Sequence, residues 1–112
     1  MHSDDAGLYR ALVEAASAGR RCALATVVHT RSSTPRKVGT KMLVDPERGL
    51  VGTVGGGCGE AEVIEAAQAS IADGRSRRLL VDLTRDPASW SPAVCGGIMD
   101  VLVEPVDPLP RP

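Results

Sequence analysis

The sequence is almost without aromatic side chains. Its 112 residues include no Phe, and Tyr9 and Trp90 are the only aromatic residues. Proteins that bind single-stranded nucleic acid stack bases on aromatic rings, so the composition argues against this class. The 13 Lys and Arg residues nearly balance the 14 Asp and Glu residues, giving a net charge of −1. No overall field attracts nucleic acid or an anionic membrane surface, and we expect neither as a partner.

Cysteine and long apolar segments are equally scarce. The three cysteines, Cys22, Cys58 and Cys95, form no CxxC pair, and their odd number argues against a disulfide framework or a zinc site. The longest apolar run, residues 22–28, is interrupted by Thr26 and falls far short of the roughly 20 residues that span a bilayer. We expect a protein of the reducing cytoplasm, with Cys22 in the core.

Apolar periodicity predicts one α+β domain. Three- and four-residue spacing predicts helices over residues 8–18 and 60–73, the second ended by Gly74. Short apolar runs predict five strands, over residues 22–28, 41–44, 50–54, 77–84 and 97–104. The second and third of these strands are expected to form a hairpin through residues 45–49. We therefore predict a mixed β-sheet of about five strands with two main helices in residues 1–105, followed by a proline-rich tail over residues 106–112.

A cationic loop is predicted over residues 30–41. It holds Arg31, Arg36, Lys37 and Lys41 and no acidic residue, and Ser and Thr hydroxyls lie beside these cations. Directional donors next to positive charge suit a phosphate or another oxyanion. The alternative is a solvated surface loop without a ligand.

A glycine-rich turn is predicted between the third strand and the second helix. Residues 52–60 read Gly-Thr-Val-Gly-Gly-Gly-Cys-Gly-Glu. Successive glycines let backbone N–H groups approach an anion closely, and a helix N-terminus adds positive potential. The spacing matches neither the dinucleotide-binding fingerprint nor the P-loop. The alternative is a tight turn that needs glycine for steric reasons alone.

Two cysteines follow or precede glycines at predicted loop ends. Cys58 lies where the glycine-rich turn meets the helix, a position that lowers the pKa of a thiol and makes it a nucleophile or metal ligand. Glu60 would either compete for the helix terminus or accept a proton. Cys95 precedes Gly96 and Gly97 and would face Cys58 across one pocket. The alternative for both cysteines is a small core residue.

Three blocks of the sequence resemble the XdhC/CoxI family. The first block is residues 33–44, the second is residues 52–60, and the third is residues 95–97, with Val-Glu-Pro following at 103–105. Members of this family are accessory proteins of molybdenum hydroxylases such as xanthine dehydrogenase and carbon monoxide dehydrogenase. The resemblance covers residues 8–105. Many members continue into a Rossmann-like domain, so the chain resembles a short form without it.

The resemblance implies a non-catalytic maturation role. Such a protein binds the molybdenum cofactor (molybdopterin) transiently, protects it while a cysteine desulfurase supplies its sulfur, and delivers it to an apo molybdenum hydroxylase. A separate Rossmann-domain subunit and a homodimer are the further partners it implies. The implied cofactor-binding residues are Ser33, Thr34, Arg36, Gly39, Lys41, Gly55, Gly56, Gly57, Cys58, Cys95, Gly96 and Gly97, with Cys58 as a contact for molybdenum. The alternatives are a small thiol-dependent enzyme that uses Cys58 and Glu60 as catalytic residues, and a regulatory protein-interaction module.

Overall fold

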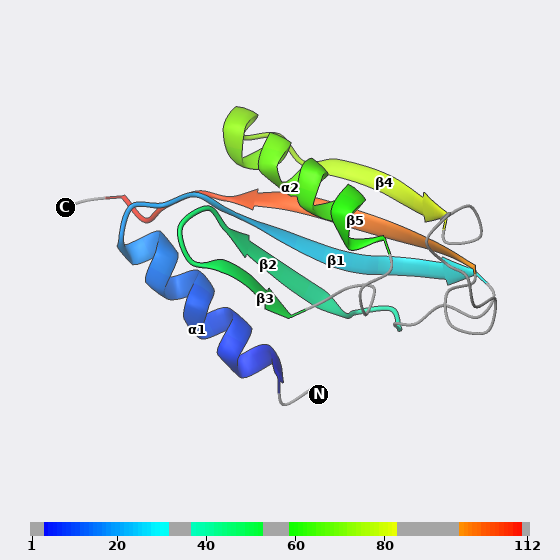
Figure 1. The fold of residues 1–112 in the computed structure, drawn as a ribbon. Helices are drawn as coiled ribbons and strands as arrows, with labels where there is room; N and C mark the ends of the chain where they lie inside the picture. The colour runs from blue at the N-terminus through cyan, green and yellow to red at the C-terminus, as the bar shows by residue number, and fades with distance from the viewer. Residues whose placement is uncertain (1–3, 32–36, 53–58, 83–96, 111–112) are drawn as a thin grey trace.

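The computed structural model describes residues 4–31, 37–52, 59–82 and 97–110. Two helices and five strands follow one another in the order α1 (Asp4–Ser17), β1 (Cys22–Arg31), β2 (Lys41–Asp45), β3 (Gly49–Gly52), α2 (Glu60–Asp73), β4 (Arg77–Asp82) and β5 (Ile98–Val106) (Figure 1). The predicted α+β class, with five strands and two helices, is confirmed. Neither helix in these ranges is long and apolar enough to cross a membrane.

The sheet is antiparallel throughout, and the prediction of a mixed sheet is wrong. The strand order is β3-β2-β1-β5-β4, and each neighbouring pair is antiparallel. Parallel neighbours require a crossover connection, usually a helix, between adjacent strands. The helical connection in this chain, α2, instead joins β3 to β4, which lie on opposite edges of the sheet.

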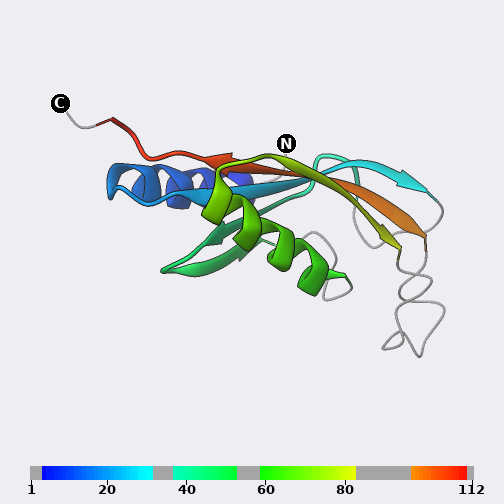
Figure 2. The ribbon, with the colours of Figure 1, turned by 90° about the horizontal axis from the view of Figure 1, so that it is seen from above.

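The two helices cover opposite faces of the sheet. Alternate residues of a strand point to opposite faces, and β1 accordingly divides its side chains between two clusters. One cluster joins α2 to the sheet and contains Ala23, Ala25, Val27, Met42, Val44, Val63, Ala67, Val81, Met99, Val101 and Val103. The other joins α1 to β1 and β2 and contains Leu8, Ala15, Cys22 and Leu43. Figure 2 shows α2 standing off one side of the sheet.

Two strands run further than the sequence predicts. β1 continues to Arg31 because its last residues pair with β5, Arg31 opposite Ile98. The first part of the predicted cationic loop is therefore strand. β5 continues past Pro105, which lies opposite Ala23. Three residues after this strand, the Leu109 N–H donates to the Ala16 carbonyl at 3.0 Å, so this segment returns to the end of α1.

A buried ion pair fixes the β2–β3 hairpin to the rest of the domain. Asp45 ends β2 and is only 4 % exposed. Its two carboxylate oxygens accept hydrogen bonds from Arg20, Nε at 3.2 Å and Nη2 at 3.0 Å, and the Glu47 N–H donates to the same carboxylate at 2.9 Å. The Arg20 hydrogen bonds lower the pKa of Asp45. The buried carboxylate is thus paired in the way that burial of a charge requires.

Candidate functional site

The topology brings the described ends of the three sequence blocks to one end of the sheet. The C-terminal ends of β1, β3 and β4 and the N-terminal ends of β2, α2 and β5 all point to this end, which we call the motif end (Figure 1). The direction of α2 follows from its other end, where Arg21, just before β1, donates from Nη1 to the Ile71 carbonyl at 3.0 Å. Antiparallel pairing therefore gathers connections that lie far apart in the sequence.

Within the motif end, the described ends of the first and second blocks, Lys41 and Gly52, lie closer to each other than to Gly97 of the third. Lys41 is opposite Thr26, and the next residue of β2, Met42, is opposite Gly52. The β5 start, by contrast, lies opposite Arg31. Thr26 and Arg31 are five steps apart on β1, while their partners Leu102 and Ile98 are four steps apart on β5 because the register shifts between Val27 and His29. At roughly 3.4 Å per residue this separation is about 14–17 Å. Gly97, beside the β5 start, is thus displaced along β1 from the pair formed by Lys41 and Gly52.

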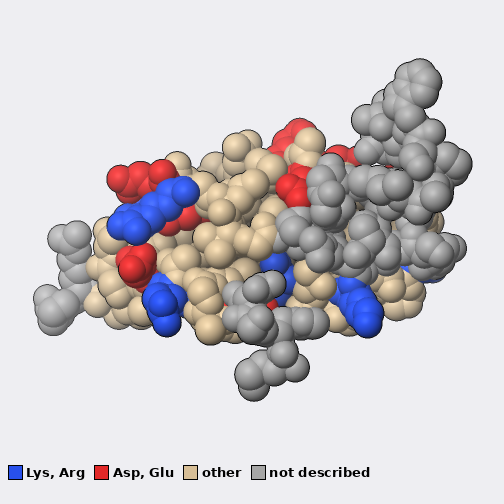
Figure 3. Space-filling view, turned by 60° about the horizontal axis from the view of Figure 1, so that its bottom comes forward, with Lys and Arg blue, Asp and Glu red and all other residues tan. Residues whose placement is uncertain are grey.

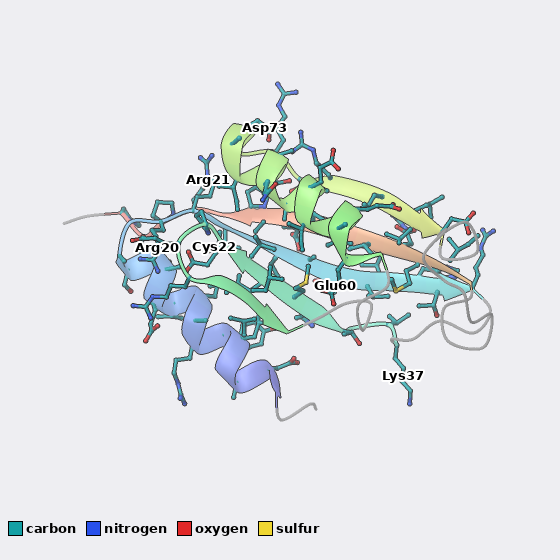
Figure 4. All side chains as sticks on the ribbon, viewed as in Figure 1. Arg20, Arg21, Cys22, Lys37, Glu60 and Asp73 are labelled. Atoms are coloured by element: carbon teal, nitrogen blue, oxygen red, sulfur yellow. The ribbon has the colours of Figure 1, made fainter. Side chains whose placement is uncertain are left out.

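Three described cations lie in or beside the first block, and none has an acidic partner among the described residues. Arg31, at the end of β1, and Lys37 are exposed, and the Lys41 Nζ donates to the Gly39 carbonyl at 3.0 Å. Figure 4 shows the Lys37 side chain extending away from the sheet at this end. Elsewhere five arginines pair with carboxylates, namely Arg20, Arg21, Arg48, Arg77 and Arg78. Arg31, Lys37 and Lys41 thus reach the motif end without a carboxylate partner in the described part of the chain, although Glu60 and Glu62 at the start of α2 also lie at this end.

The surface view shows opposite charges paired at the other end of the molecule. In Figure 3, blue Lys and Arg side chains lie beside red Asp and Glu side chains on the left. The Arg48–Glu14 pair, with an Nη1–Oε2 distance of 3.2 Å, is one such neutralised contact. Exposed cations without a carboxylate partner in the described ranges, such as Arg31 and Lys37, are suited to binding an anion.

Glycines shape the backbone on both sides of this surface. Gly39 adopts φ +94°, and its N–H donates to the Val27 carbonyl at 2.8 Å, which leads the chain into β2. Gly52 adopts φ +83°, and a Cβ atom on it would lie 2.7 Å from the Lys41 carbonyl oxygen. L-residues with side chains rarely adopt such φ values. Gly52 is therefore required for the close approach of β3 to the start of β2.

The N-terminus of α2 opens onto the motif end. Gly59 is its N-cap in the left-handed conformation, with φ 75° and no side-chain cap hydrogen bond. The Gly59 carbonyl accepts a hydrogen bond from the Val63 N–H at 3.4 Å. Glu60 and Glu62 lie in the first turn, where acidic side chains interact favourably with the helix dipole. Figure 4 shows Glu60 at this start of α2; its role as a proton acceptor stays a prediction.

Most of the predicted binding residues lie outside the described residues: Ser33, Thr34, Arg36, Gly55, Gly56, Gly57, Cys58, Cys95 and Gly96. The pocket between Cys58 and Cys95 stays a prediction. The structure places Gly39, Lys41 and Gly97 at the motif end, and Gly97 is buried with φ 88°. The sequence pattern named Lys37 as one of the cations of the predicted loop and Gly52 as the first residue of the glycine-rich turn, but neither was among the implied cofactor-binding residues. The close approach of Gly52 to Lys41 depends on strand pairing, for which a glycine within a strand is the sequence signal.

Cys22 is confirmed as a core residue. It is 1 % exposed and lies near Arg20, away from the motif end (Figure 4). Burial raises the pKa of its thiol, so the thiolate form is disfavoured at neutral pH. Within the described ranges, no group of three or more His, Cys, Asp or Glu residues could hold a metal ion.

An apolar cavity of about 470 Å³ lies on the α2 side of the hairpin. Its lining combines the β2–β3 hairpin with one stripe of α2, namely Val44, Asp45, Pro46, Gly49, Leu50, Ile64, Gln68 and Ile71. Since the hairpin turn is at the end of β2 remote from Lys41, the cavity is not part of the motif end. It also lacks the cations that distinguish that end.

The fold and the motif end define a small α+β domain in which exposed cations lie near glycines with positive φ, Gly39 and Gly52. The chain belongs to the XdhC and CoxI family, which matches it over residues 15–83. This match begins in α1 and ends just after β4, so it includes the first and second blocks.

Two similar proteins are much longer than this chain. The Escherichia coli (strain K12) protein YqeB, described as uncharacterized, is 36 % identical over 81 residues, which is 72 % of this chain and 15 % of YqeB. A crystal structure described as a xanthine dehydrogenase from Bacillus halodurans superposes with a TM-score of 0.70 at 35 % identity, covering 87 % of this chain and 30 % of that one. The likeness therefore concerns one portion of each relative.

Proposed function

We propose that this protein is a maturation factor for molybdenum hydroxylases. It binds the molybdenum cofactor as cargo and assists its sulfuration or its insertion into an enzyme of the xanthine dehydrogenase or carbon monoxide dehydrogenase type. Membership of the XdhC and CoxI family supports this class of function. The similarity to a protein described as a xanthine dehydrogenase agrees with it.

The observation that carries the proposal is the presence at the motif end of two lysines that form no ion pair with a described residue. Molybdopterin bears a phosphate and an anionic dithiolene. Lys37 and Lys41 are cations without a carboxylate partner in the described part of the chain, and an oxyanion would supply that partner. The chemistry of these donors therefore fits the cargo.

The three blocks take different roles in this proposal. The first block supplies cations and hydroxyls for the phosphate, and the second supplies backbone N–H groups at the start of α2. Cys58 contacts the molybdenum or its sulfur, and the third block closes the far side. No catalytic residue is needed, because binding and protection of the cargo constitute the function.

The proposed partners follow from this role. An apo molybdenum hydroxylase receives the cofactor, and a cysteine desulfurase provides the sulfur. A separate Rossmann-domain subunit contributes what longer family members carry in one chain. We further propose that the protein acts in the cytoplasm as a homodimer.

Cofactor transfer tests the proposal. Molybdenum cofactor released from a donor enzyme is mixed with the purified protein, and the molybdenum that co-elutes on gel filtration is measured. The loaded fraction is then added to an apo hydroxylase. We expect molybdenum to co-elute with the protein and hydroxylase activity to appear. Absence of molybdenum from the protein fraction at micromolar concentration would overturn the proposal.

A further inference from the structure

Among the described residues, no strand or helix pairs with the outer edge of β4 (Arg77–Asp82). β4 is the last strand of the sheet, with β5 on its inner side, and Figure 1 shows no described element along its outer side. Its Leu80 is 68 % exposed, more than any other large apolar side chain in the described ranges. Proteins usually protect such an edge because its unpaired backbone groups recruit other strands.

The side chains of β4 divide cleanly between two faces. Leu79 and Val81 belong to the cluster packed beneath α2. Arg78, Leu80 and Asp82 alternate with them and therefore point to the opposite face. Since α1 packs on the other half of the sheet, against β1 and β2, it does not cover this row. One face of the edge thus presents a cation, an apolar side chain and an acid in sequence.

This order is self-complementary under antiparallel pairing. If two β4 strands pair with Leu80 opposite Leu80, then Arg78 of each lies opposite Asp82 of the other. Residues paired across two strands project to the same face of the sheet. An alternative register must therefore keep Arg78, Leu80 and Asp82 of both strands on one face. Centring on Leu79 instead places Arg78 opposite Leu80 and forms no charge pair. Parallel pairing places like charges opposite each other, which is unfavourable.

The intramolecular partner of Arg78 strengthens this argument. Arg78 donates to Asp100 on β5, with Nε–Oδ1 at 2.8 Å and Nη2–Oδ2 at 2.6 Å. This contact holds the guanidinium over the sheet face, and a guanidinium has five N–H donors. Arg78 would thus bridge Asp100 of its own chain and the second copy's Asp82.

We propose that a second copy of this chain docks on β4, with the two-fold axis passing beside Leu80. The pairing joins two five-stranded sheets into one continuous sheet and leaves both α2 helices on the same face. It is an isologous interface, in which each chain offers the same surface to the other. The inference rests on the self-association included in the proposed function and is independent of cofactor binding.

Cysteine cross-linking tests both the interface and its register. Leu80→Cys is placed in a Cys58→Ser, Cys95→Ala background, with the buried Cys22 retained. Matched variants carry Leu79→Cys on the same strand and Leu50→Cys, which is 46 % exposed, on the opposite edge. Because a disulfide requires Cβ atoms about 4 Å apart, we expect on the order of tenfold more cross-linked dimer from Leu80→Cys than from either control.

Sedimentation of the otherwise natural chain completes the test. Leu80→Asp places two like charges at the axis and should convert the dimer to monomer, whereas Val13→Asp on α1 should leave it dimeric. A monomeric natural chain, efficient cross-linking through Leu79→Cys or Leu50→Cys, or a dimer unaffected by Leu80→Asp would each overturn the interface. Cofactor retention is measured separately, so its failure would leave this result standing.

Discussion

Replacement of Gly52 by Ala should destabilise the domain more than the same replacement at Gly49. Both glycines lie in β3, and both have positive φ, +83° for Gly52 and +91° for Gly49. They differ in their surroundings. An added Cβ at Gly52 would lie 2.7 Å from the Lys41 carbonyl oxygen, whereas one at Gly49 would meet no heavy atom within 4 Å.

The magnitudes follow from these two situations. A left-handed conformation costs an L-residue about 1–2 kcal/mol, and this is the whole expected effect of Gly49→Ala. Gly52→Ala adds the displacement of a backbone carbonyl in a packed sheet, for which overpacking costs of about 1–3 kcal/mol are typical. We therefore expect a loss of about 2–5 kcal/mol for Gly52→Ala.

Chemical unfolding followed by circular dichroism measures this difference directly. For a domain of this size, each kcal/mol also corresponds to a change of about 4–8 °C in the melting temperature. Gly49→Ala serves as the control for conformational strain. Equal destabilisation by the two variants would refute the inference that β3 approaches β2 too closely for a side chain at Gly52.

Two further predictions concern titration and thiol reactivity. Hydrogen bonds from Arg77 lower the pKa of Asp73 from 3.8 to about 2. The stability that this carboxylate contributes is therefore present above about pH 4 and is lost as the pH falls towards 2. The unfolding midpoints measured at pH 5 and pH 2.5 should differ less for Asp73→Asn than for the natural chain, and an unchanged difference would contradict this. Cys22 is 1 % exposed, and burial raises the pKa of its thiol. It should therefore react with a thiol reagent at neutral pH only after the protein unfolds. Rapid modification of Cys22 in the folded Cys58→Ser, Cys95→Ala variant would show that Cys22 is not buried in the core.

Local signals in the sequence predicted most of the elements. The spacing of apolar residues indicated both helices, and Gly74 ends α2 in the left-handed conformation, its N–H donating to the Ser70 carbonyl at 2.8 Å. The turn signals of residues 45–49 indicated the hairpin, which the structure confirms with β2 ending at Asp45 and β3 beginning at Gly49. These features depend on neighbours in the sequence, and propensity and turn chemistry are therefore sufficient to predict them.

Long-range pairing was not accessible in the same way. Thr30 and Arg31 have the composition of a loop, yet they form strand because β5 lies beside them. The antiparallel arrangement likewise depends on where α2 delivers β4, at the edge opposite β3. The register between strands that are distant in the sequence depends on the packing of the whole sheet. A local sequence pattern therefore cannot predict it.

The same distinction applies to the candidate site. Residue types indicated a cationic block and a glycine-rich block, and the fold places their described ends on adjacent strands, Lys41 in β2 and Gly52 in β3. The displacement of Gly97 along β1 could not be predicted, because it depends on the pairing of Arg31 with Ile98. Nor could sequence spacing predict that Lys37 forms no ion pair with a described residue.

The most direct measurement of the central claim is the molybdenum retained by the Lys37→Ala, Lys41→Ala double variant. A matched control, Arg10→Ala with Arg75→Ala, removes the same charge from exposed positions away from the first block. Losing two charge-assisted contacts, each worth roughly 1.5–3 kcal/mol, should weaken cofactor binding at least about tenfold. We predict that the double variant loses the cofactor on gel filtration while the control retains it. Equal retention by the two variants would contradict an anion-binding role for the motif end.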